Sequence, residues 1–102
     1  MKNHETWPPQ PTAWIAKEAK RLMEEQGLRS HDLVVAGDFD APYISRLFSN
    51  KHPDLMVTKL VQLAFALNAS SAELLGPLEE HYRAKRIEEI HQQGIRAPWI
   101  IL

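Results

Sequence analysis

Two aspartates, Asp38 and Asp40, stand two residues apart in the middle of the 102-residue chain, a spacing that could suggest paired carboxylates for acid–base chemistry. No nucleophile, glycine-rich phosphate loop or third polar group accompanies them, so this pattern does not indicate an active site. No two histidines have the i,i+4 spacing of a helical metal site. We therefore expect neither an enzyme nor a metal or other cofactor. The histidines are His4, His31, His52, His81 and His91.

Basic side chains in the same region indicate a different chemistry. Between Ala41 and Lys59 the ionised cations are Arg46, Lys51 and Lys59, and the only acid is Asp54. The net charge of −1 argues against a general nucleic-acid coat, because Lys and Arg normally supply much of the affinity for phosphate. A local basic strip on a neutral body favours a protein that binds a specific site.

The composition sets further limits. With 44% hydrophobic residues, the chain is suited to one domain with a buried core. The absence of cysteine excludes disulfides and thiolate metal sites. The first seven residues lack the apolar stretch of a signal peptide, and no apolar run approaches the length of a membrane span. We therefore expect a cytoplasmic protein that does not enter a membrane.

Proline and glycine mark the ends of the first expected elements. Residues 7–11 include three prolines, so residues 1–11 are expected to form a non-helical arm. Thr12 is the expected N-cap of a first helix, which Gly27 ends. After a loop at residues 50–54, helical spacing predicts a further helix with an apolar stripe. Its members are Met56, Leu60, Leu63, Ala64 and Leu67. The three leucines of this stripe are expected to form the core together with Ile15, Leu22, Leu33, Ile44 and Leu47.

Residues 30–48 predict two short helices joined by a tight turn. Ser30 can cap the first helix, and Gly37 followed by Asp38 supplies the turn. Asp40 is the natural N-cap of the second helix. Two helices arranged in this way within about twenty residues are typical of a helix-turn-helix, a layout that points to DNA.

The last third of the chain predicts two more helices. Ser70 and Glu73 have the spacing of a capping box, which opens a short fifth helix that Gly76 closes. Pro77 then starts a sixth, amphipathic helix that Gly94 ends.

The C-terminal extension carries more apolar surface than a helix-turn-helix core needs, because that core is expected to be complete at Leu75. Surplus apolar surface indicates an interface, and reading two half-sites on DNA needs a two-fold partner. We therefore expect the protein to be a homodimer in which residues 77–102 form the contact between the two chains. The contact residues would be Leu78, Tyr82, Ile87, Ile90, Trp99, Ile100, Ile101 and Leu102.

Several short motifs between Trp14 and Leu75 have characteristic offsets: Gly27-Leu28, Leu33, Ile44-Ser45-Arg46-Leu47, Leu60-Val61-Gln62-Leu63-Ala64, Ala66-Leu67-Asn68 and Ser70 to Leu75. Together they resemble the lambda-repressor-like or Cro-like helix-turn-helix regulators, also called the xenobiotic-response-element type. The resemblance implies an all-α fold, with a five-helix DNA-binding domain at residues 12–76. The amphipathic helix and apolar tail at residues 77–102 lie outside it.

The resemblance also implies which residues contact DNA. In that family the second helix begins at a phosphate, the exposed face of the third lies in the major groove, and the next loop returns to the backbone. Base contacts would come from Asp40, Ala41, Pro42, Tyr43 and Arg46. Phosphate contacts would come from Ser30, Ser49, Asn50, Lys51 and His52, with Lys59 as a further cation.

Base recognition would rest mainly on Arg46, since arginine pairs with guanine edges, and on Tyr43. Ala41 and Pro42 cannot form side-chain hydrogen bonds to a base, although either could contact a thymine methyl group. Asp40 could accept a hydrogen bond from cytosine, but helix capping is the assignment that we favour.

The sequence thus predicts a regulator of transcription, a repressor that binds an inverted repeat in double-stranded DNA as a dimer. The alternative is a protein-interaction module, such as an antitoxin-like protein that binds a protein partner. The neutral charge and the Ala41-Pro42 pair favour this alternative slightly.

Overall fold

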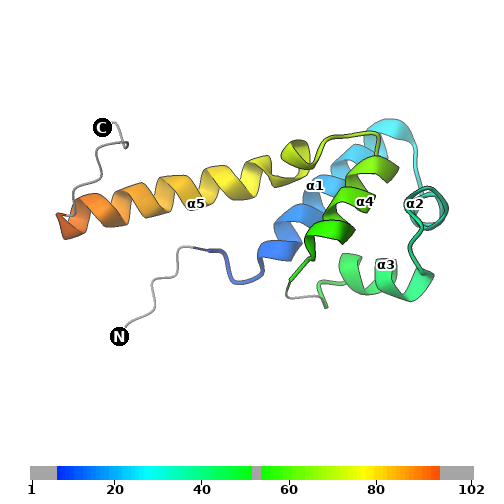
Figure 1. Cartoon of the computed structure of the whole chain (residues 1–102), viewed down its shortest axis with the longest axis horizontal. Helices are drawn as coiled ribbons and strands as arrows, with labels where there is room; N and C mark the ends of the chain where they lie inside the picture. Colours follow the sequence, from blue (N-terminus) through cyan, green and yellow to red (C-terminus); the bar gives the residue numbers. More distant parts are fainter. Residues whose placement is uncertain (1–6, 52–53, 95–102) are drawn as a thin grey trace.

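The computed structural model describes residues 7–51 and 54–94, and this part of the chain is entirely helical (Figure 1). The all-α class predicted from the sequence is confirmed. Five α-helices follow one another without any strand in these ranges. They are α1 (Pro11–Gln26), α2 (Ser30–Gly37), α3 (Ala41–Phe48), α4 (Val57–Ala66) and α5 (Ser71–Gln93).

Local hydrogen bonds fix several helix ends where the sequence predicts them. The Asp40 carboxylate accepts a hydrogen bond from the Tyr43 backbone N–H at 2.8 Å and caps α3. Ser70 and Glu73 form the reciprocal capping box at the start of α5. Gly27 ends α1 in the left-handed conformation that glycine adopts without a steric penalty.

Two predicted N-caps are wrong by one or two residues. The cap of α1 is Gln10, so Pro11 is already helical and Thr12 is a buried residue of the first turn. The cap of α2 is Arg29, whose backbone N–H donates to the Asp32 carboxylate at 2.8 Å, and Ser30 is the first helical residue. Proline suits the first turn because its missing N–H would have no partner there.

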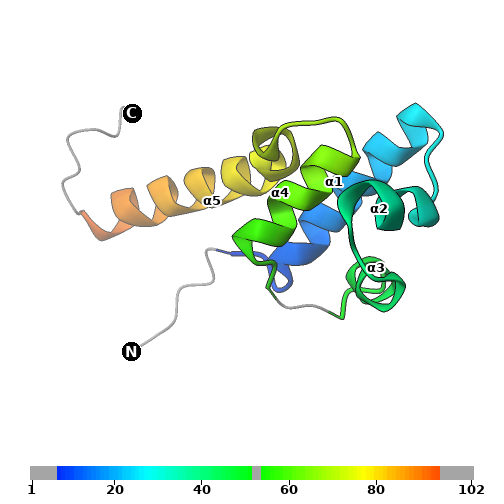
Figure 2. The ribbon, with the colours of Figure 1, turned by 45° about the vertical axis from the view of Figure 1, so that its right-hand side comes forward.

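The prediction of separate fifth and sixth helices is also wrong. Helix α5 runs without interruption through Gly76 and Pro77 to Gln93, and the turns before Pro77 lie at an angle to the rest of the helix (Figures 1 and 2). A proline inside a helix bends it, because its ring clashes with the carbonyl group four residues earlier. Both sides of the bend reach the core, since Leu74 and Leu78 are buried.

The core lies where the five helices meet. Helix α1 packs on α3 and α5, and α2 packs on α3 and α4. Figure 2 shows α4 lying across α1, with α2 and α3 on one side and α5 extending from the other. Met56, predicted for the buried stripe of α4, is instead exposed. The predicted core residues that are buried include Ile15, Leu22, Leu33, Ile44, Leu47, Leu60, Leu63 and Leu67.

Aromatic contacts attach both α1 and the segment before it to α5. The rings of Trp7 and Tyr82 stack with centroids 4.4 Å apart, and those of Trp14 and His81 lie 4.9 Å apart. Tyr82, predicted to contact a second copy, therefore contacts its own chain.

The remaining residues of the predicted C-terminal interface have different positions. Leu78 belongs to the chain's own core, so it presents little surface to a second copy. Ile87 and Ile90 are half-buried on the part of α5 that extends from the helical body. The predicted contacts at residues 99–102 lie outside the described residues.

Candidate nucleic-acid interface

A tight turn holds α2 and α3 together. Asp38 adopts the left-handed conformation, with φ 59° and ψ 44°, which a short Asp side chain tolerates better than most residues. Phe39 follows it and is buried in the core, and its backbone N–H donates to the Val34 carbonyl oxygen at 3.1 Å. The turn is therefore anchored by a side chain as well as by backbone hydrogen bonds.

Helix α4 closes this turn from the other side. The Gln62 side-chain amide donates to the carbonyl oxygen of Gly37 at 2.8 Å and lies 3.4 Å from that of Asp38. A Cβ atom on Gly37 would lie 2.7 Å from the Phe39 ring and 3.2 Å from the Ala66 Cβ atom. Gly37 is thus required by close packing, and Gln62 satisfies carbonyl groups at the end of α2.

The residues predicted to read bases lie on the first turns of α3. Ala41 and Pro42 are exposed at its start, and Arg46 is exposed one turn further on. Asp40 is used as the helix cap, which supports the capping assignment that we favoured. Arg46 is therefore the only exposed cation among the predicted base-reading residues.

Tyr43 is less accessible than its predicted role suggests. It is half-buried, and its ring stacks on the Phe39 ring with centroids 5.4 Å apart and planes 11° from parallel. The Lys59 Nζ atom lies 5.2 Å from the Tyr43 ring centre and 5.5 Å from that of Phe39. Lys59, predicted to contact phosphate, thus makes cation–π contacts within the chain.

Burial raises the pKa of Tyr43 above its usual value, because the phenolate loses solvation, and the nearby positive charge of Arg46 lowers it by a smaller amount. The phenol therefore keeps its proton at neutral pH and can donate a hydrogen bond. Arg46 and Tyr43 are therefore expected to interact electrostatically on α3, and the positive charge of Arg46 favours the phenolate form of Tyr43.

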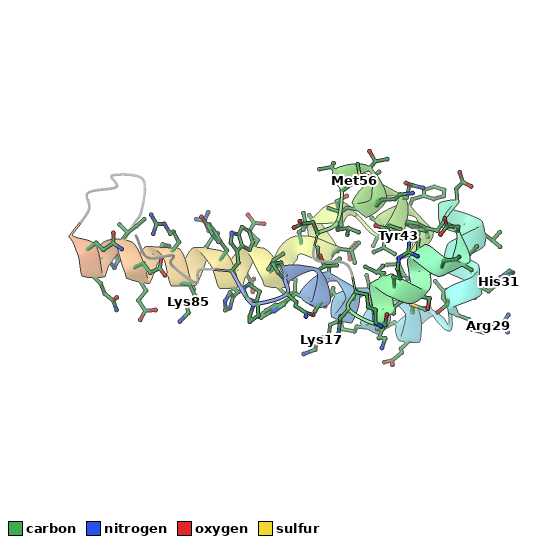
Figure 3. All side chains as sticks on the ribbon, turned by 90° about the horizontal axis from the view of Figure 1, so that it is seen from below. Lys17, Arg29, His31, Tyr43, Met56 and Lys85 are labelled. Carbon is green, nitrogen blue, oxygen red and sulfur yellow. The ribbon has the colours of Figure 1, made fainter. Side chains whose placement is uncertain are left out.

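A shallow hollow of about 550 Å³ lies between the start of α2 and the exposed side of α3. It brings together three residues predicted to contact DNA: Ser30, Ala41 and Ser49. Figure 3 shows Arg29 and His31 at the end of the molecule far from the projecting part of α5, with Tyr43 further in. The other lining residues are His31, Val34, Ile44, Ser45 and Phe48.

The segment after α3 carries the remaining predicted phosphate contacts. The Ser49 hydroxyl and the Lys51 backbone N–H both donate to the Arg46 carbonyl oxygen, at 3.2 and 2.9 Å. Asn50 adopts a left-handed conformation with φ 60°, and the side chain of Lys51 is exposed. His52 lies outside the described residues.

Sequence reasoning missed the residues that hold this surface in place. Phe39 stands alone between two aspartates, so no periodic pattern marks it as a core residue. Gln62 stands among apolar residues of α4, and only the folded chain shows that it reaches the turn. The nearest sequence signal was Gly37, which indicated a turn but not the close approach of Phe39 and Ala66.

Within residues 7–51 and 54–94, no group of three or more His, Asp or Glu side chains could hold a metal ion. None of the helices in the described part of the chain combines the length and apolar character that crossing a bilayer requires. Comparisons of the chain with protein-family models, with curated proteins and with solved structures find no match. The function must therefore be argued from the residues of this chain.

Proposed function

We propose that this protein is a sequence-specific DNA-binding regulator of the lambda-repressor-like helix-turn-helix type, and that α3 enters the major groove. The short α2 and α3, their tight turn and the motifs shared with that family support this proposal. The regulator would be a cytoplasmic repressor that occupies an inverted repeat as a dimer.

The observation that carries the proposal is the combination of an anchored turn with an uncovered helix face. Phe39, Gly37 and Gln62 fix the angle between α2 and α3 from inside the chain. The outer face of α3 then presents Arg46, which is exposed but does not line the hollow, while Ser30 and Ser49 lie beside the hollow. A rigid helix with a cation on its open side suits the major groove, where the serines can contact the adjacent phosphates.

The test begins with selection of bound sequences from random duplex DNA, followed by affinity measurements over a range of salt concentrations. Binding should weaken steeply with salt, because each phosphate contact releases counterions. Arg46→Ala should cost about 1–3 kcal/mol of specific binding and relax preference at one base pair in each half-site. Lys51→Ala should weaken all sequences alike and reduce the salt slope by about one.

Arg83→Ala is the matched control for Arg46→Ala, because it removes an exposed arginine from α5, away from α3. It should change neither the preferred sequence nor the affinity. If no sequence is enriched, or if Arg46→Ala and Arg83→Ala behave alike, the assignment of α3 as the reading helix is wrong.

One observation favours the second candidate, a module that binds a protein partner. Lys59 is engaged by the Phe39 and Tyr43 rings, so the exposed face around α3 has fewer available cations than the sequence indicated. This candidate would be supported if the chain bound no DNA and bound a protein partner with an affinity that does not depend on salt.

A further inference from the structure

Most of the large apolar side chains that the described residues expose gather on one segment. Six such side chains are exposed, and four of them lie between residues 56 and 65. Their exposed fractions are 70% for Met56, 76% for Val57, 54% for Val61 and 73% for Phe65. Figure 3 shows Met56 on the outer side of α4. We call these four residues the α4 stripe.

The spacing of the α4 stripe makes it a continuous ridge. Val57, Val61 and Phe65 are four residues apart, so they follow one of the rows that helices use when they pack against each other. The face of α4 beside this ridge is also apolar, since Leu60, Leu63 and Ala64 are buried. The polar residues Thr58, Lys59 and Gln62 share the remaining side of the helix. Helix α4 therefore has two neighbouring apolar faces, and this chain covers only one of them.

The lack of an available charge on α4 limits the kinds of partner that the α4 stripe can bind. Lys59 is the only ionisable residue of the helix, and its Nζ atom is held over the Phe39 and Tyr43 rings. The α4 stripe therefore offers no cation to an anionic lipid surface and no charge to a charged peptide. A surface with the same uncharged ridge can approach it without electrostatic repulsion.

We propose that the α4 stripe binds the α4 stripe of a second copy of this chain. In this arrangement two equal ridges interlock about a two-fold axis that passes close to Val61, so that Val57 of each copy approaches Phe65 of the other. The stripe has a size on the order of 400 Å², within the range of the largest apolar patches on small proteins, which are often functional. Two such stripes would bury on the order of 800 Å² of apolar surface, so with a polar rim the dimer would be of the weak class that buries up to about 1,200 Å². The stripe forms the apolar centre of an interface whose rim is polar.

This interface differs from the one expected at the C-terminus. Leu78 and Tyr82 are occupied within the chain, by the core and by the ring of Trp7. Among the described residues the α4 stripe has no such contacts, and each of its four side chains is more than half exposed. The proposal does not rest on DNA binding, so it can be tested without DNA.

The first experiment compares the sedimentation of the full-length chain with that of Val61→Lys. Lysine forms helices better than valine and the site is exposed, so the variant should fold. It should raise the dissociation constant of the dimer at least about tenfold, because two like charges would meet near the axis. The matched control is Val35→Lys, at an exposed valine of α2 on the side opposite the buried Leu33; it should leave the dimer unchanged.

The second experiment uses the absence of cysteine from the chain. In Val61→Cys the two thiols face each other across the axis, within the short Cβ–Cβ distance that a disulfide needs, so mild oxidation should give a covalent dimer. Val35→Cys should form little covalent dimer under the same oxidation, because its thiols lie outside the proposed interface.

Three results would overturn the proposal. One is a full-length chain that stays monomeric at high micromolar concentration. Another is a dimer that survives Val61→Lys but is lost in Ile90→Asp, which would place the interface on α5. The third is disulfide formation that is no faster for Val61→Cys than for Val35→Cys.

Discussion

Tyr43 combines its proposed role in recognition with a place at the edge of the core. Its ring stacks on Phe39, and the Lys59 Nζ atom lies at a similar distance from both ring centres, 5.2 Å from Tyr43 and 5.5 Å from Phe39. Sequence reasoning assigned it to base contact from the family pattern alone. The position of its ring depends on Phe39 and Lys59, which come from the turn and from α4, so only the folded chain could show it.

The raised pKa of Tyr43 predicts a pH dependence of stability. Burial favours the protonated phenol in the folded chain, so its contribution to the free energy of unfolding is fully present below the unfolded pKa of about 10. That contribution is lost as the pH rises through the higher folded-state pKa. Urea unfolding between pH 8 and about pH 11 should therefore show a smaller alkaline loss for Tyr43→Phe than for the unmodified chain.

An absorbance titration of the phenolate gives a separate check. Arg46→Ala should raise the pKa of Tyr43 further, because the guanidinium charge favours the phenolate. An unchanged titration in Arg46→Ala would show that the two side chains do not interact in solution.

The close packing around Gly37 predicts that a larger residue at this position destabilises the folded chain. In Gly37→Ala the new Cβ atom would lie 2.7 Å from the Phe39 ring, so the ring or the backbone must shift. Overpacking of this kind lowers the free energy of unfolding by about 1–3 kcal/mol, measured by urea denaturation. Gly76→Ala is the control, because nothing lies within 4 Å of its added Cβ atom and alanine favours a helix interior, so this variant should be more stable. If Gly37→Ala left the free energy of unfolding unchanged, the turn would be able to rearrange around the added methyl group without loss of stability.

The helices show which ends can be predicted from sequence. Asp40 and Ser70 were predicted correctly because their caps are local contacts with the residue three positions later. The break at Gly76 and Pro77 was predicted wrongly, since the burial of Leu74 and Leu78 on either side favours a continuous, bent helix. A local rule fails where contacts distant in sequence outweigh it.

The cap of α3 gives a prediction that separates stability from recognition. Asp40→Ala removes the acceptor for the Tyr43 N–H and should lower the free energy of unfolding by about 1 kcal/mol. Asp40→Asn keeps an acceptor oxygen and should retain most of that stability. Urea denaturation of both variants decides the point, and equal losses in the two would contradict the capping role.

The whole molecule consists of a helical body and a projecting helix. Its extents are 49 × 27 × 21 Å, and the long dimension follows α5 away from the other helices (Figure 1). The sequence predicted most of the core, because the apolar residues of the first four helices follow helical spacing. It did not predict that Trp7 and Trp14 would contact Tyr82 and His81, since such pairs leave no periodic signal.

This shape predicts uneven protection of backbone amides from hydrogen exchange. No residue after Leu78 is buried in the described part of the chain, so the second half of α5 has few contacts that oppose local opening. Amides at residues 84–93 should exchange much faster than those of α1 and α4, as measured by mass spectrometry or NMR. Because dimerisation through the α4 stripe leaves this half of α5 uncovered, its protection should not depend on protein concentration. Protection that rises with concentration at residues 84–93 would instead show that α5 meets a second copy.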